Sequence, residues 1–102
     1  METLRKSRHF KRVAEGGSRE KLETITVCRL PKQEGITRIG ISVSGKAGGS
    51  VERNRIKRRL REALRKNASL LPEKEDIVII AGRKCLEADF SEIEKDIRRL
   101  RR

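Results

Sequence analysis

The strongest periodic pattern in the chain lies over residues 50–66, where apolar residues recur at helical spacing. Residues 45–49 just before it are rich in glycine, Ser50 suits an N-cap, and Glu52 lies where a helix dipole favours an acid. At about 100° per residue, four apolar residues fall on one narrow stripe: Ile56, Leu60, Ala63 and Leu64. The pattern predicts a helix that buries this stripe and exposes its other sides.

Two stretches upstream of this helix favour extended structure. Residues 22–30 are rich in Thr, Ile and Val, and residues 36–44 place larger apolar residues on one side and Gly40, Ser42 and Ser44 on the other. The short link over residues 31–35 predicts that the two strands form a hairpin. The small residues leave room for another element to lie on that face of the sheet.

The remaining apolar stretches complete the expected fold. Residues 76–81 form a continuous apolar run, which is typical of a strand covered on both faces. Residues 4–17 and 89–102 have helical patterns, and residues 82–88 are expected to be a loop. We expect a single small α+β domain over residues 1–102, with a central four-stranded mixed β-sheet packed with three helices in an α-β-β-β-α-β-α order.

Charge indicates the partner of the central helix. The chain has 27 Lys and Arg against 15 Asp and Glu, a net charge of +12. Asn54, Arg58, Arg61 and Arg65 line the side of the helix opposite the apolar stripe, with Lys57 at its edge. Like charges one turn apart oppose helix formation, and a polyanion would reverse that effect. Nucleic acid is therefore the expected partner.

Other classes of site find little support in the sequence. His9 is the only histidine, and the one dense acidic group, at residues 73–76, is explained as well by a charged loop, so we assign no catalytic and no metal-binding residue. Cys28 and Cys85 are far apart and are expected to be reduced, with a disulfide as the alternative. Without a long apolar run or an apolar segment after the basic N-terminus, we expect a cytoplasmic protein with no membrane contact.

One part of the sequence resembles a known family. Residues 39–44, the glycine-rich turn and residues 51–58 are similar to the signature of the bacterial ribonuclease P protein subunit. Its most specific part is Arg53-Asn54-Arg55 followed by Lys57 and Arg58. Supporting similarities lie in the first helix and in the strand at residues 76–80. The resemblance also implies a left-handed β-α-β crossover, although right-handed crossovers dominate among proteins.

The resemblance implies a protein subunit that assists an RNA enzyme. The RNA removes the 5′ leader of precursor tRNA by Mg²⁺-dependent hydrolysis, while the protein binds no cofactor of its own and needs no protein partner. It also implies contacts to the catalytic RNA by Lys46, Arg53, Asn54, Arg55, Lys57, Arg58 and Arg61, to which the helix pattern adds Arg65. A cleft for the single-stranded leader is expected at Lys6 and Phe10, with Ile25 and Val27 on the sheet side.

Three alternatives stay open at this point. A ribosomal or other structural RNA-binding protein would have a similar basic surface without a processing role. A DNA-binding protein could use a similar basic helix, but no leucine heptads follow it to form a zipper dimer. A nuclease acting alone would need a cluster of acids that the sequence lacks.

Overall fold

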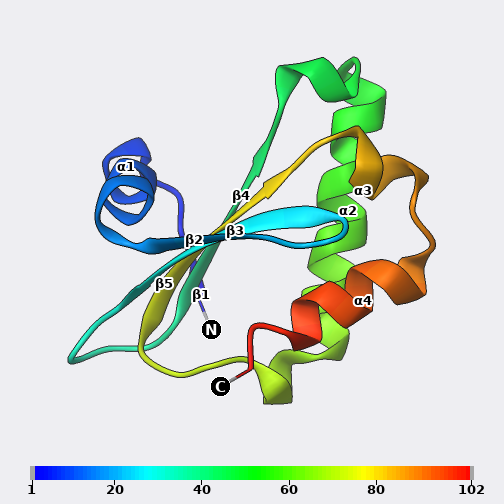
Figure 1. The fold of residues 1–102 in the computed structure, drawn as a ribbon. Coiled ribbons are helices and arrows are strands. Elements are labelled where there is room, and N and C mark those ends of the chain that lie inside the picture. The colour runs from blue at the N-terminus through cyan, green and yellow to red at the C-terminus, as the bar shows by residue number, and fades with distance from the viewer. Residues whose placement is uncertain (1, 102) are drawn as a thin grey trace.

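A five-stranded mixed sheet forms the centre of the computed structural model, which describes residues 2–101 (Figure 1). Its strand order is β1-β4-β5-β3-β2. β1 and β5 both run parallel to β4, whereas β3 is antiparallel to its neighbours β5 and β2. The strands are β1 (Glu2–Thr3), β2 (Ser18–Lys21), β3 (Ile25–Pro31), β4 (Arg38–Val43) and β5 (Glu75–Ala81).

Four helices cover the two faces of this sheet. α1 lies on one face, and α2 and α4 lie on the other, with α3 near the beginning of α2 (Figure 1). Short 3₁₀ turns, η1 and η2, precede and follow α2. The helices and turns are α1 (Ser7–Gly16), η1 (Gly45–Ala47), α2 (Ser50–Lys66), η2 (Ala68–Leu70), α3 (Arg83–Glu87) and α4 (Phe90–Arg98).

The α+β class is confirmed, but the strand pairing differs from the prediction. The hairpin predicted between residues 22–30 and 36–44 is wrong, because β5 lies between β3 and β4 and pairs with both. β5 is apolar on both faces, so the central position buries both of them. β2 forms the hairpin with β3 instead. The prediction had one strand too few because β1 and β2 are short and fully exposed, so their sequences show no alternating apolar pattern.

Small residues on β4 allow α1 to approach the sheet closely. A Cβ atom on Gly40 would lie 2.4 Å from Cζ of Phe10, so only glycine leaves room for this ring. Val13 of α1 is fully buried with Leu4, Cys28 and Val78. The expectation that another element lies on the small-residue side of this strand is confirmed. The helix begins at Ser7, whose side chain does not cap it.

The larger core lies on the opposite face, beneath α2 and α4. The four residues of the predicted α2 stripe, Ile56, Leu60, Ala63 and Leu64, are all buried there, which confirms the periodic reading. α4 begins with a capping box in which Glu92 accepts a hydrogen bond from the backbone N–H of Asp89. α3 replaces the predicted loop at residues 82–88 and buries Cys85 in this core.

The acidic residues at the start of β5 are structural. Glu75 and Asp76 point to opposite faces, as neighbours on a strand do. Glu75 forms a bidentate pair with Arg29, at 2.9 and 3.0 Å. Asp76 is 1% exposed and accepts hydrogen bonds from three cations: Arg12, Lys32 and Arg38. The hydrogen bonds from Arg38, and then from Lys32, hold the pKa of Asp76 far below its usual range.

The two cysteines are free and buried, Cys28 in the core beneath α1 and Cys85 of α3 in the core beneath α2 and α4. The sheet lies between the two cores, so a disulfide joining these cysteines does not fit this fold. Burial raises the pKa of the Cys85 thiol to about 11, so this thiol stays protonated at neutral pH.

α2 connects two strands that are adjacent and parallel, β4 and β5, which gives the expected β-α-β unit. The left-handed sense of that crossover stays a prediction from the resemblance. None of the helices described within residues 2–101 combines the length and the apolar character needed to cross a bilayer.

Candidate nucleic-acid interface

The glycine-rich turn fixes where α2 begins. Gly48 has a φ of +140°, and a Cβ there would lie 2.9 Å from Cβ of Glu52, so glycine is required on both counts. Glu52 Oε1 accepts a hydrogen bond from the backbone N–H of Gly49 at 3.2 Å. Gly49, rather than the predicted Ser50, is therefore the N-cap. The backbone N–H of Lys46 donates to Ser44 Oγ. The side chain of Lys46 is exposed just before the helix.

The outer side of α2 carries cations that have no acidic partner in the part of the chain that the structure describes. We call this surface the α2 basic face and define it by five exposed side chains: Arg53, Asn54, Arg55, Arg58 and Arg61. Within residues 2–101, none of its arginines forms an ion pair. Lys57 is half-buried at the edge of this face. The face is thus a strong electrostatic attractor for phosphate groups.

Arg65 differs from the other predicted contacts on this helix. It is exposed, but its guanidinium donates two hydrogen bonds to Glu62, at 2.5 and 3.2 Å. The same contact lowers the pKa of Glu62 and raises that of Arg65. Part of the Arg65 charge is therefore neutralised within the helix, and Arg65 is a weaker candidate for RNA contact than Arg58 or Arg61.

Two further cations of α2 have structural roles. The guanidinium of Arg59 donates to the backbone carbonyls of Cys85, Leu86 and Ala88, at 2.6 to 2.9 Å. These bonds satisfy carbonyl groups at the end of α3 and fasten it to α2. Lys66 Nζ lies 5.1 Å from the centroid of the Phe90 ring. These contacts join α2 to the elements that follow β5.

A strip of the sheet beside α1 remains uncovered on the face that α1 occupies. Strand pairing aligns Ser42, Ile80, Thr26 and Lys21 in one row across β4, β5, β3 and β2, and paired residues point to the same face. Ile80 and Thr26 are half-buried, and the two end residues are exposed. We call these four residues the open sheet row. In the neighbouring row, Gly40 lies under Phe10, so an aromatic ring borders the open row.

The structure corrects the sheet side of the predicted leader cleft. Ile25 and Val27 are 3% and 1% exposed and belong to the core beneath α2 and α4, on the face away from Phe10. The structure therefore does not bring them together with Phe10 and Lys6. Thr26 and Ile80, rather than Ile25 and Val27, lie on the sheet face beside α1. Lys6 is exposed just before α1, and Phe10 is half-buried.

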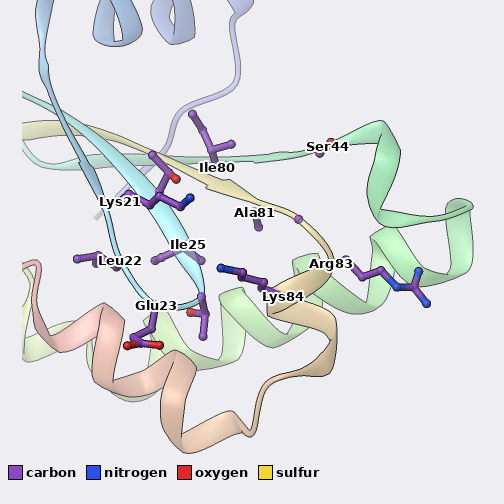
Figure 2. A pocket seen from close by; sticks show the side chains of 12 residues that line it. Lys21, Leu22, Glu23, Ile25, Ser44, Ile80, Ala81, Arg83 and Lys84 are labelled. Carbon is purple, nitrogen blue, oxygen red and sulfur yellow. The ribbon is translucent and has the colours of Figure 1, made fainter.

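A pocket at the end of the sheet adds cations that the sequence analysis did not select. Figure 2 shows it between the β2–β3 turn, the end of β4 and the start of α3. Lys21, Arg83 and Lys84 lie around it and are exposed. Arg83 also donates to the Ala47 carbonyl at 3.2 Å, which links α3 to the glycine-rich turn. The sequence feature that could have identified these cations is the Arg83-Lys84 pair, which follows the buried strand β5 after a single glycine.

Comparison with known proteins agrees with this arrangement. Residues 1–102 match the sequence profile of the family described as Ribonuclease P. The chain belongs to this family. It is 39% identical over 97 residues to the ribonuclease P protein component of Caldanaerobacter subterraneus subsp. tengcongensis, covering 95% of this chain and 84% of that protein. It is 40% identical over 99 residues to the ribonuclease P protein component of Clostridium acetobutylicum, covering 95% and 83%.

Solved structures of ribonuclease P proteins share the fold. The Staphylococcus aureus RNase P protein superposes with a TM-score of 0.83 at 28% identity, covering 98% of this chain and 92% of that one. The Thermotoga maritima RNase P protein gives 0.82 at 29% identity, covering 97% of each chain. The family predicted from Arg53-Asn54-Arg55 and its surroundings is therefore confirmed.

His9 lies among cations near α1. His9 Nδ1 lies 3.3 Å from the Arg38 guanidinium. Desolvation, followed by Arg38 and other nearby cations, lowers the pKa of His9. Among the described residues, 2–101, no three side chains of the His, Cys, Asp and Glu types gather as a metal site would require. For this member of the ribonuclease P family, the described side chains form surfaces suited to binding polyanions.

Proposed function

We propose that this chain is the protein subunit of ribonuclease P and promotes removal of the 5′ leader from precursor tRNA. The proposal rests on family membership and on the α2 basic face, whose arginines are exposed and form no ion pair with the acids of residues 2–101. In this proposal the ribonuclease P RNA, with Mg²⁺, carries out the hydrolysis. The protein lowers the electrostatic cost of bringing two polyanions together.

The α2 basic face is the proposed contact with the catalytic RNA. The major groove of an A-form helix is too deep and narrow for side chains to read, so arginines on a helix suit phosphates and irregular loops. Arg58 and Arg61 can each contact a phosphate, and the amide of Asn54 can donate and accept hydrogen bonds at an unpaired base. Lys46, exposed in the turn before α2, extends the same surface.

The leader is proposed to lie beside α1, along the open sheet row. Phe10 and Ile80 offer apolar contact, while Lys6 and Lys21 offer charge. Single strands bind such troughs through backbone charge and through stacking on rings, with little dependence on sequence. Residue 14, one helical turn after Phe10, is alanine, so the trough relies on one ring and on charge.

Reconstitution tests this function. We expect the purified chain, added to a bacterial ribonuclease P RNA at low Mg²⁺, to increase the rate of cleavage of a precursor tRNA that carries a leader. Polylysine, matched in total positive charge, is the control for unspecific neutralisation. No stimulation, or equal stimulation by polylysine, would reject the proposal. A ribosomal-type RNA-binding protein would bind RNA in this assay without increasing cleavage.

A further inference from the structure

A groove runs along the free edge of the sheet, between β4 and α2. β1 covers only Arg38 and Ile39 of β4, so the rest of this strand has no neighbour on that side within the described residues. The groove has a volume of about 510 Å³, within the range of small-ligand sites. We call it the edge groove. It is lined by residues of β1, the segment before α1, β4, α2 and η2, and by Phe10 of α1.

The walls of the edge groove combine an apolar floor with a basic rim. Ile39, Ile41 and Leu64 form part of the floor. Lys57 and Arg61 project from α2 at the rim and form no ion pair within residues 2–101. Arg5 lines the groove from the other side, together with one acid, Glu2. Arg65 also lines it but is paired with Glu62, so the net charge of the rim is positive.

Backbone groups of β4 add hydrogen-bonding capacity to this groove. The N–H of Leu4 donates to the Ile39 carbonyl at 3.0 Å, so the polar groups of Ile39 point to the outer edge. Because backbone direction repeats every two residues in a strand, those of Ile41 point the same way. Among the described residues, the N–H and C=O groups of Ile41 form no backbone hydrogen bond on that side. An edge of this kind can bind the polar rim of a base through N–H and C=O groups.

We propose that the edge groove holds one unpaired nucleotide of the ribonuclease P RNA. The base lies against Ile41 and Leu64, and its phosphate is held by Lys57 and Arg61. This inference rests on the proposed function and adds a specific contact to it. A nucleotide fits better than an acidic peptide because it presents an apolar ring face, a polar ring edge and a phosphate together, as the floor, the strand edge and the rim require.

The position of the groove assigns it to the catalytic RNA rather than to the leader. Arg61 belongs to both the edge groove and the α2 basic face, so one RNA can occupy both. Phe10 of α1 reaches one end of the groove. The floor residues Ile39, Ile41 and Leu64 nevertheless belong to the core beneath α2, whereas the open sheet row faces the side of the sheet that carries α1. One nucleotide of the RNA that covers α2 therefore reaches the groove without crossing the sheet.

Filling the groove without changing its charge tests the inference. Ala68 is exposed at one end of the groove, and the adjacent Ser69 is equally exposed but lies outside it. For Ala68→Leu, we expect the affinity for ribonuclease P RNA, without substrate, to fall about tenfold, equivalent to about 1.4 kcal/mol. The salt dependence should stay unchanged because no cation is lost. The affinity of Ser69→Leu for the same RNA should be within about twofold of that of the unmodified chain, because residue 69 lies outside the proposed contact.

Cross-linking provides a second measurement that does not depend on the leucine variant folding. The native cysteines are buried, so Ala68→Cys and Ser69→Cys each introduce one accessible thiol for a photoreactive label. We expect the label at residue 68 to react mainly with one unpaired nucleotide of the ribonuclease P RNA, and the label at residue 69 not to reach it.

Three results obtained with RNA would overturn the inference: unchanged affinity in Ala68→Leu, cross-links confined to base-paired RNA, or cross-links that form only to the leader when precursor tRNA is present. Competition by an acidic peptide but not by RNA would assign the groove to a protein partner and would also reject it. If the unmodified chain binds the RNA and stimulates cleavage in any of these cases, only the groove assignment fails. If it does neither, the proposed function fails.

Discussion

Removing Arg58 and Arg61 together is the most direct test of the α2 basic face. Both side chains are exposed, lie one turn apart, and form no ion pair within the described residues. Replacing them with alanine should leave stability within about 0.5 kcal/mol of the unmodified chain, because surface changes of this kind rarely do more. Losing two like charges one turn apart also removes a small repulsion. A change in binding can therefore be attributed to the lost contacts.

The expected change in salt dependence follows from the number of phosphates contacted. Each neutralised phosphate contributes about 0.7 to the logarithmic salt slope for single strands and about 0.9 for duplexes. Two lost contacts should reduce the slope by about 1.4 to 1.8. Between about 50 and 200 mM salt, the affinity of the unmodified chain should therefore fall about tenfold more than that of the double variant.

The measurement is binding to ribonuclease P RNA over this range of salt. The matched control is Arg99→Ala with Arg101→Ala, which removes two exposed cations near the C-terminal end of α4. Each double variant lowers the net charge from +12 by two, to +10. An unchanged slope in the Arg58 and Arg61 variant would remove both residues from the interface. An equal reduction in the control would show that net charge, rather than this face, determines binding.

Two other predictions concern α1 and the buried acid beneath it. Phe10→Ala should reduce the preference for precursor tRNA over mature tRNA in binding assays, and an equal loss for both would mean that the ring only packs on Gly40. Asp76→Asn should lower the free energy of unfolding at pH 7 by about 3 kcal/mol, because it leaves Arg38 and Lys32 without their acid. Since the folded-state pKa of Asp76 is depressed, its contribution is present above about pH 4 and is lost as pH falls further, so urea unfolding should show a smaller difference at pH 3. A difference independent of pH would contradict this.

Local pattern was sufficient to predict α2. Its four apolar residues Ile56, Leu60, Ala63 and Leu64 recur at helical spacing, and all four are buried in the 17-residue helix. The start of the helix was misplaced by one residue because Ser50 is a good N-cap, yet Glu52 satisfies the N–H of Gly49. The exposed arginines were identified for the same reason, since a helix with one apolar stripe has few other ways to face the core.

Strand order depended on information that is not local. The short link over residues 31–35 favoured a hairpin, but pairing β3 with β4 would leave the doubly apolar β5 at an edge. The error at Ile25 and Val27 has a similar cause. β3 has buried residues on both faces, so its alternation could not tell which face α1 covers. Gly40 carried that information, because its missing side chain is filled by Phe10.

The roles of individual cations were also decided by distant partners. Nothing in the sequence marks Arg59 for a structural role, but the structure places its guanidinium on three carbonyls around the end of α3. Arg29 and Arg38 are likewise committed to Glu75 and Asp76. Counting basic residues therefore overestimates the number that can bind RNA.

The central position of β5 affects when the protein can fold during its synthesis. β5 bridges β3 to β4, and it follows both of them and α2 in the chain, beginning at Glu75. Until it leaves the ribosome, the earlier strands lack the neighbour that joins them, and α2 emerges before the sheet that it covers. The sheet can therefore be completed only after β5 has been made. Until then the nascent chain exposes the basic residues of α2 without the sheet that supports this helix, and the complete RNA-binding surface forms only after β5 has been made.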